Sequence, residues 1–328
     1  MVRGSGPESD RRKGKAQSTE GGERRPTGGA KGKNRASHRG RTLERDSGPD
    51  TRADRGRARG PAPAKEGGRR PESRAVERPV VRMAPEQEIL YGRNAVMEAL
   101  RAGKRVRRLL VSGEATREEP VREAIRLATA AGVVTEEVRR EQLDAVAPEH
   151  QGMAAVVAPF EYVGWGDLLE RLSVSDHPPV VLLLDTLQDP QNLGSLLRTS
   201  EAVGVDAVVL PKRRSVHVTP AVVRSSAGAV EHMAVARVPN LVRAAEELKG
   251  IGIWVAGIDM AGDRLHWKLD MTGPTALVLG GEDRGIGQLM KESCDFLIRL
   301  PMKGHVSSLN AAVAGSVVLY EMLRQRGG

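Results

Sequence analysis

Three polar segments in the C-terminal half of the chain each adjoin an apolar run about the length of a strand. The segments span residues 185–198, 277–286 and 300–310. Residues 179–185 are continuously apolar up to a final acid, as expected of a strand buried on both faces. Strand patterns alternate with helix patterns around the segments, which predicts an open parallel α/β sheet. Ligands of such sheets bind beyond the carboxyl ends of the strands, where all three segments fall.

The other elements expected in this region follow the same alternation. We expect helices at residues 193–203, from 219 onward, at 241–249 and at 309–324, and strands at 206–210, 252–257, 275–279 and 296–300. No Gly-x-Gly-x-x-Gly follows any of these strands. The sequence therefore lacks the fingerprint of a dinucleotide-binding Rossmann fold.

The N-terminal part of the chain has a different composition, which changes near residue 85. Residues 1–80 carry 22 Lys and Arg against 11 Asp and Glu, and no aromatic residue precedes Tyr91. Such a segment buries too little apolar surface to offset its chain entropy, so we expect residues 1–85 to be a disordered basic Gly/Arg-rich tail. It is either a loose arm for polyanions, acting by phosphate neutralisation, or a solvated extension without a specific role.

A smaller folded unit is expected between the tail and the C-terminal region. Short strand and helix patterns alternate over residues 86–162 and predict a compact α/β domain. Residues 163–178 contain glycines and a proline and predict a linker with a short helix. The C-terminal domain then covers residues 179–328.

Several classes of protein are excluded by composition. Cys294 is the single cysteine, which excludes a disulfide framework and cysteine metal sites. The seven histidines show no ligand spacing, so no metal is expected. No apolar run approaches the roughly 18 residues that a membrane span needs, and the basic N-terminus lacks the apolar core of a secretory signal. A cytoplasmic protein without membrane partners is the expectation.

Together, the three polar segments resemble the signature of the SpoU/TrmH branch of the SPOUT superfamily. These proteins are S-adenosylmethionine-dependent RNA 2′-O-ribose methyltransferases. The resemblance runs from about Val180 to the C-terminus and implies a parallel sheet with a deep trefoil knot. The domain before it resembles the small RNA-binding domain, of L30e-like fold, of the ribosomal RNA members. Relatives are homodimers whose sites the partner completes, so the resemblance also implies a homodimer.

The resemblance assigns a catalytic set to the three segments. Its members are Asn192, Arg198, Glu282, Ser308 and Asn310. A guanidinium is effectively always protonated, so we assign Arg198 to clamping the target phosphate rather than to acting as a base. Each segment taken alone also has an ordinary explanation. These are an Asn turn before a helix-surface Arg, a Gly-rich turn with a solvated carboxylate, and a helix start capped by Ser308.

The resemblance also assigns residues to S-adenosylmethionine. They are Gly280, Leu300, Met302 and Leu309. The Gly280-Gly281 pair lets the backbone approach a ligand closely. Pro190 and Gly194 are expected to shape a turn between Asn192 and Arg198.

The closest resemblance is to enzymes that methylate the ribose 2′-OH of a guanosine in large-subunit (23S) rRNA. The RNA-binding domain favours rRNA, because relatives that act on tRNA often lack it. Three alternatives stay open: tRNA 2′-O-methylation, resistance-type rRNA methylation, and a non-catalytic RNA-binding factor in ribosome assembly. A non-catalytic assembly factor would not need the catalytic set, so the presence of that set favours an enzyme.

Overall fold

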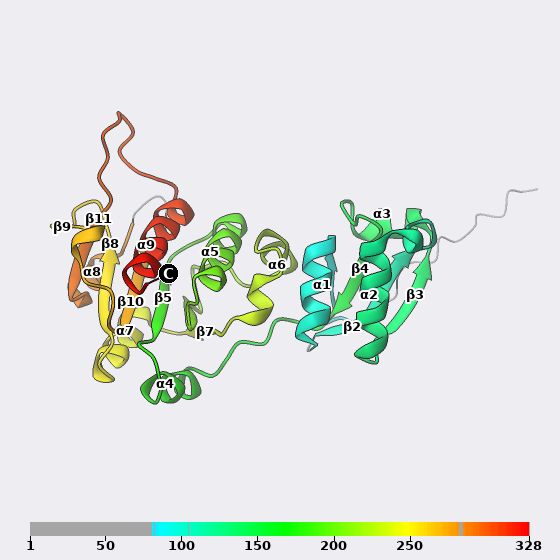
Figure 1. Cartoon of the computed structure of the whole chain (residues 1–328), viewed down its shortest axis with the longest axis horizontal. Helices are drawn as coiled ribbons and strands as arrows, with labels where there is room; N and C mark the ends of the chain where they lie inside the picture. The colour runs from blue at the N-terminus through cyan, green and yellow to red at the C-terminus, as the bar shows by residue number, and fades with distance from the viewer. Residues whose placement is uncertain (1–80, 82, 104, 282–284, 328) are drawn as a thin grey trace, which may run out of the picture. The chain divides into compact units, whose positions relative to one another are not determined.

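The computed structural model describes residues 81, 83–103, 105–281 and 285–327. Almost all of the expected tail, and Glu282, lie outside these residues. The described chain contains two sheets, which belong to consecutive regions of the sequence (Figure 1).

The first sheet has four strands in the order β1-β4-β2-β3. Strand β4 pairs antiparallel with β1 and β2, and β2 pairs parallel with β3. The strands are β1 (Glu88–Tyr91), β2 (Val106–Ser112), β3 (Val134–Val138) and β4 (Met153–Val157). The helices are α1 (Arg93–Ala102), α2 (Glu119–Ala130) and α3 (Arg140–Val146), with a 3-10 turn η1 (Gly113–Arg117).

Strand β4 shows why this region folds as a layered unit. All of its side chains are buried. Met153, Ala155 and Val157 pack into the core that contains the apolar faces of α1 and α2. Ala154 and Val156 pack on the other side, with Leu143 of α3. Alternation with a period of two therefore gives one strand two apolar faces, each covered by helices.

The second sheet has seven strands in the order β7-β6-β5-β10-β8-β11-β9, and every neighbouring pair is parallel. Its strands are β5 (Val180–Asp185), β6 (Ala207–Pro211), β7 (Val235–Val238), β8 (Trp254–Ile258), β9 (Arg264–Leu265), β10 (Thr275–Gly280) and β11 (Phe296–Arg299). Its helices are α4 (Trp165–Ser173), α5 (Pro190–Ala202), α6 (Pro220–Ser225), α7 (Leu241–Gly250), α8 (Gln288–Ser293) and α9 (Ala311–Gln325), with short 3-10 turns η2 (Ala229–His232) and η3 (His266–Lys268).

Helices cover both faces of this sheet. Leu182 and Leu184 of β5 join the core formed with α5, α6 and α9. Val181 and Leu183 join the core formed with α4, α7 and α8. The expected open parallel α/β sheet is confirmed, and the expected trefoil knot stays a prediction. No helix in the described ranges is long and apolar enough to cross a membrane.

Two helix starts differ from the sequence-based expectation. Helix α5 begins at Pro190 rather than at residue 193, because the Asp189 side chain accepts hydrogen bonds from the backbone N–H groups of Gln191 and Asn192. Helix α9 begins at Ala311, and its cap is Asn310. The alternative explanation of Ser308 as the cap of this helix is therefore wrong.

Candidate active site

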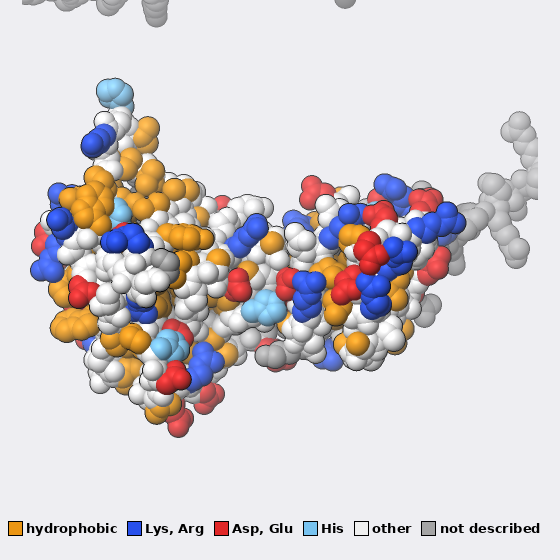
Figure 2. Space-filling model, viewed as in Figure 1, with side chains coloured by type: hydrophobic (Ala, Val, Ile, Leu, Met, Phe, Trp, Pro, Cys, Tyr) orange, Lys and Arg blue, Asp and Glu red, His pale blue; other side chains and the backbone are white. Residues whose placement is uncertain are grey.

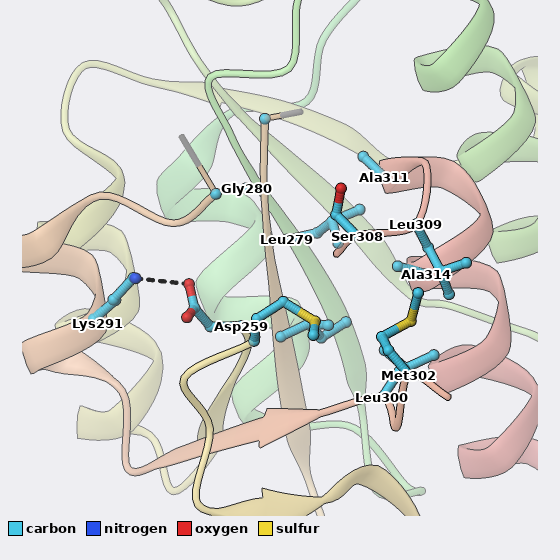
Figure 3. A pocket seen from close by; sticks show the side chains of 14 residues that line it. Asp259, Leu279, Gly280, Lys291, Leu300, Met302, Ser308, Leu309, Ala311 and Ala314 are labelled. Atoms are coloured by element: carbon cyan, nitrogen blue, oxygen red, sulfur yellow. Dashed lines mark ion pairs between the residues drawn. The ribbon is translucent and has the colours of Figure 1, made fainter. Parts of the chain in front are cut away.

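A cavity of about 300 Å³ opens beyond the carboxyl ends of β8 and β10, where β11 leads into α9. It contains residues of the second and third polar segments. The lining residues are Ile258, Asp259, Met260, Leu279, Gly280, Gly281, Gly285, Lys291, Leu300, Met302, Ser308, Leu309, Ala311 and Ala314. Figure 3 shows Asp259 and Lys291 on one side and Leu309 and Ala314 on the other. The cavity thus has an apolar wall opposite a charged one.

The second segment contributes backbone packed too closely for side chains. A Cβ on Gly280 would lie 2.0 Å from the carbonyl carbon of Gly285. A Cβ on Gly281 would lie 2.9 Å from the carbonyl oxygen of Thr186. Both positions therefore require glycine, and they leave peptide groups at the cavity edge. Glu282, predicted to stand beside the site, lies outside the described residues.

The third segment forms the opposite side of the cavity. Leu300 is buried at the end of β11, whereas Ser308 and Leu309 are exposed in the loop before α9. This loop extends away from the sheet (Figure 1). All three residues line the cavity with Met302. The structure thus brings together the four residues assigned to the cofactor, Gly280 included, and one assigned to catalysis.

The first segment is joined to the third by a pair of amides. Asn310 Nδ2 donates a hydrogen bond of 2.9 Å to Asn192 Oδ1. Asn310 Oδ1 accepts from the backbone N–H groups of Ala312 and Val313, which caps α9. Asn192 is buried in the first turn of α5. The pair therefore fixes the N-terminal ends of two helices beside the cavity.

Arg198 lies six residues beyond Asn192 on α5, is exposed and does not line the cavity. The expected turn between the two was wrong, because both lie inside one helix. Pro190 occupies the first turn of α5, where its missing N–H costs nothing. Gly194 is a packing position, since a Cβ there would lie 1.8 Å from Ser225 Oγ of α6.

Asp259 and Lys291 were missed by the sequence analysis. Lys291 Nζ lies 2.7 Å from Asp259 Oδ2, and the Asp259 side chain is only 10% exposed (Figure 3). Asp259 directly follows β8, and Asp185 similarly ends β5; an acid at the end of a strand was the one signal available. Lys291 comes from the short helix α8, which had no clear pattern. The pair offers an acceptor and a donor to the polar ends of a ligand.

Other polar chemistry is sparse around the cavity. Within the described ranges, no group of three or more His, Cys, Asp or Glu is placed to hold a metal ion. Burial raises the pKa of the Cys294 thiol to about 12, so this side chain is a neutral packing group at physiological pH. Fold and site define an α/β protein with a small-molecule cavity at the carboxyl edge of a parallel sheet, preceded in sequence by a mixed sheet of four strands.

Comparisons with known proteins agree with this class. Residues 179–320 match the SpoU rRNA methylase family, and residues 89–163 match the RNA 2′-O ribose methyltransferase substrate-binding domain. The protein YacO of Bacillus subtilis (strain 168), provisionally named a TrmH family tRNA/rRNA methyltransferase, is 43% identical over 74% of this chain and 98% of its own length. A protein of Staphylococcus aureus (strain MSSA476) with the same provisional family name is 41% identical over 74% of this chain and 97% of its own.

A solved structure shares the fold. The SpoU methyltransferase AviRb from Streptomyces viridochromogenes, in complex with the cofactor S-adenosylmethionine, superposes with a TM-score of 0.63 and 28% identity, over 74% of this chain and 91% of that one. The chain belongs to the SpoU/TrmH family of RNA 2′-O-ribose methyltransferases. Its cofactor is S-adenosylmethionine.

The residues around the cavity fit this cofactor. Leu279, Leu300, Leu309 and Ala314 give an apolar wall for an adenine ring, and the glycine backbone leaves peptide groups that can contact its edge. The charges of Asp259 and Lys291 suit the ribose hydroxyls and the amino-acid part.

Proposed function

We propose that this protein, acting in the cytoplasm, methylates the ribose 2′-OH of a guanosine in large-subunit rRNA. One observation carries the assignment of the site: the second and third polar segments line one cavity, and the first segment is hydrogen-bonded to the third through Asn192 and Asn310. The match of residues 89–163 to a substrate-binding domain supports an RNA substrate, and the choice of rRNA rests on the sequence resemblance, since relatives that act on tRNA often lack this domain. The choice of guanosine rests on the sequence resemblance. We assign the domains to residues 1–85, 86–162, 163–178 as linker, and 179–328.

The proposed roles follow from position and chemistry. When bound, S-adenosylmethionine supplies a methyl group on a cationic sulfur. Arg198 holds the target phosphate, and its exposure leaves the guanidinium free to reach RNA. Asn192 and Asn310 hold α5 and α9 in register, while Ser308 and Glu282 orient groups at the reacting oxygen. The 2′-OH proton leaves to phosphate or water, and positioning supplies most of the rate.

We also propose that the enzyme is a homodimer formed through α9. Exposed apolar side chains occupy one stripe of this helix, at i, i+4 and i+7: Val313, Val317 and Tyr320. Val306 and Leu309 of the preceding loop are also exposed. Figure 2 shows hydrophobic side chains along this loop and beside it. A contiguous apolar surface of this kind marks an interaction site, and here it adjoins the cavity.

Methyl transfer from labelled S-adenosylmethionine to large-subunit rRNA and to bulk tRNA, measured in parallel, tests the proposal. Nucleoside analysis of the products should recover the label as 2′-O-methylguanosine from rRNA alone. Label in tRNA would support the methyl-transfer reaction but contradict rRNA as the substrate. The relatives are named tRNA/rRNA methyltransferases, so this outcome is worth measuring. RNA binding without any label would favour an assembly factor.

A further inference from the structure

A second hollow, of about 430 Å³, lies at the carboxyl ends of β5, β6 and β7. We call it the basic pocket. It is lined by Asp185, Thr186, Pro211, Arg213, Arg214, Pro239, Asn240, Leu241, Val242, Gly287, Gln288, Leu289 and Met290. Its helical residues come from α7 and α8; α8 also contributes Lys291 to the active-site cavity, but the two hollows share no lining residue. The two hollows are therefore distinct.

The rim of the basic pocket carries cations that no described residue neutralises. Lys212, Arg213 and Arg214 are consecutive and exposed in the loop after β6. Within the described chain, none of their side chains forms an ion pair or a hydrogen bond. Arg243 of α7, by contrast, pairs with Glu247. Repulsion between adjacent unpaired cations is relieved when a polyanion binds.

The loop is held in place at both ends. Lys212 N donates to the Val238 carbonyl at 2.8 Å, and Val216 N donates to the Leu187 carbonyl at 2.9 Å. Between them Arg214 has a positive φ of 59°, which a non-glycine residue rarely adopts. Thr186, which also lines the pocket, has a φ of 58°. A strained backbone conformation persists only where the surrounding structure holds it in place. Such conformations are found preferentially at functional sites.

The remaining lining suits a nucleobase. Pro211, Pro239 and Leu289 are apolar, and Leu289 is 71% exposed although its side chain is large. Asn240 and Gln288 add amide groups that can bond to a base edge. Asp185 is the acid in the lining, and its Oδ2 already accepts a hydrogen bond from Gly287 N at 2.9 Å. The volume falls in the range of small-ligand sites.

We propose that the basic pocket binds an unpaired nucleotide of the substrate RNA that neighbours the target nucleotide. Arg213 and Arg214 contact its phosphates, and the base packs on the apolar walls. The inference rests on the RNA methyltransferase function proposed above.

Glycines that follow β10 in the sequence line both hollows. Gly281 and Gly285 line the active-site cavity, and Gly287 lines the basic pocket. Gly280 at the end of β10 pairs in register with Asp185 at the end of β5. An RNA strand that crosses this edge of the sheet can therefore place one nucleotide over the cofactor and another in the basic pocket. Single-stranded RNA is bound in this way, by phosphate contacts combined with packing of bases.

The test of the charges is a double variant of the full chain, R213Q/R214N, with Asn chosen because it tolerates a positive φ. Filter binding of labelled large-subunit rRNA and of bulk tRNA is measured over a series of KCl concentrations. Each phosphate contact on a single strand contributes about 0.7 to the slope of log Kd against log salt, so the slope should fall by about 1.4. R213Q alone should give half of this loss, without touching the strained position.

The matched control is R171Q/K268Q, which removes two exposed charges outside both hollows. It should leave the slope within about 0.3 of the wild type. In methyl transfer, R213Q/R214N should raise KM for RNA several-fold with KM for S-adenosylmethionine unchanged. A slope equal to that of the control would overturn the inference.

The apolar wall is tested by L289S, with V174S as the control at an equally exposed site away from the pocket. L289S should weaken binding to unpaired RNA several-fold and leave the salt slope unchanged, because no charge is lost. An affinity equal to that of V174S would exclude base packing. Binding needs no turnover, so wild-type protein that binds RNA without methylating it would overturn the proposed function and not this inference.

Discussion

At the scale of single residues, Asn310 has two roles that substitution can separate. It caps α9 through its Oδ1, and it donates through Nδ2 to Asn192. N310A removes both, and loss of a cap alone costs about 1 kcal/mol of the free energy of unfolding. N310S keeps a good cap, but its side chain is too short to reach Asn192.

We therefore expect N310A to lower both the unfolding temperature and the turnover, and N310S to lower turnover with near-wild-type stability. Thermal unfolding and methyl transfer on the same preparations measure this. Full activity of N310S would show that the amide pair has no part in catalysis.

Substitution of Arg198 is expected to affect activity strongly and stability hardly at all. Its side chain is exposed and bonds to no described residue, so R198A should leave the unfolding temperature unchanged. As the proposed phosphate clamp, it should be needed for turnover, and kcat/KM should fall by roughly 100-fold or more, the effect of losing one positioned charge. R198K keeps the charge without the bidentate fork and should recover only part of the activity. Cooperative unfolding of R198A at a much lower temperature would contradict this role.

At the scale of elements, Gly194 tests how closely α5 must pack against α6. A Cβ at this position would collide with Ser225, whose Oγ donates to the Pro190 carbonyl at 3.0 Å. G194A should therefore cost about 1–3 kcal/mol of the free energy of unfolding. Gly250, at the end of α7, has open space around its Cβ position, and G250A is the control. Equal stability of the two variants, by urea unfolding, would mean that α5 can shift without cost.

Helix α9 carries the proposed dimer surface. V317E places a charge in the middle of its apolar stripe, and burying that charge in an interface would cost several kcal/mol. We expect V317E to be a folded monomer by light scattering and to lose methyl transfer, because in the proposed dimer the partner completes each site. V134E alters an equally apolar exposed valine of the first sheet and should remain a dimer. A V317E dimer would place the interface elsewhere.

The elements that the sequence predicted are those whose apolar pattern is strong. Strands β5 and β10 are continuous apolar runs, and both were expected within one residue of their bounds. The start of α5 was missed although Asp189 and Pro190 are standard start signals, because the polar segment around them was interpreted as a turn. Helices α3 and α8 and strand β7 were missed, because elements of four to seven residues carry too little periodicity.

The site was predicted where the resemblance covers it and missed where only folding brings residues together. Gly280, Leu300 and Leu309 were expected at the cofactor and lie around one cavity. Asp259 and Lys291 are far apart in sequence and meet because α8 packs beside the end of β8. Nothing in the local sequence around either residue reports that contact.

At the scale of the whole molecule, the charge is divided unequally between the tail and the rest. Residues 1–80 contain 22 Lys and Arg against 11 Asp and Glu, and the remainder contains 29 against 31. Most of the long-range attraction to RNA must therefore come from the tail, because the rest has almost no net charge. Local cations such as Arg198 and Arg213 can hold phosphates only after the RNA has arrived.

Deletion of residues 1–80 should consequently weaken RNA binding and flatten its salt dependence, since fewer counterions are released. It should leave kcat and KM for S-adenosylmethionine unchanged, because both depend on the cavity beyond β8 and β10. Binding of rRNA across a salt series, with turnover at saturating RNA, measures the two effects separately. A deletion variant with the wild-type salt slope would make the tail a solvated extension, and the catalytic domain would then have to capture RNA by its local cations alone.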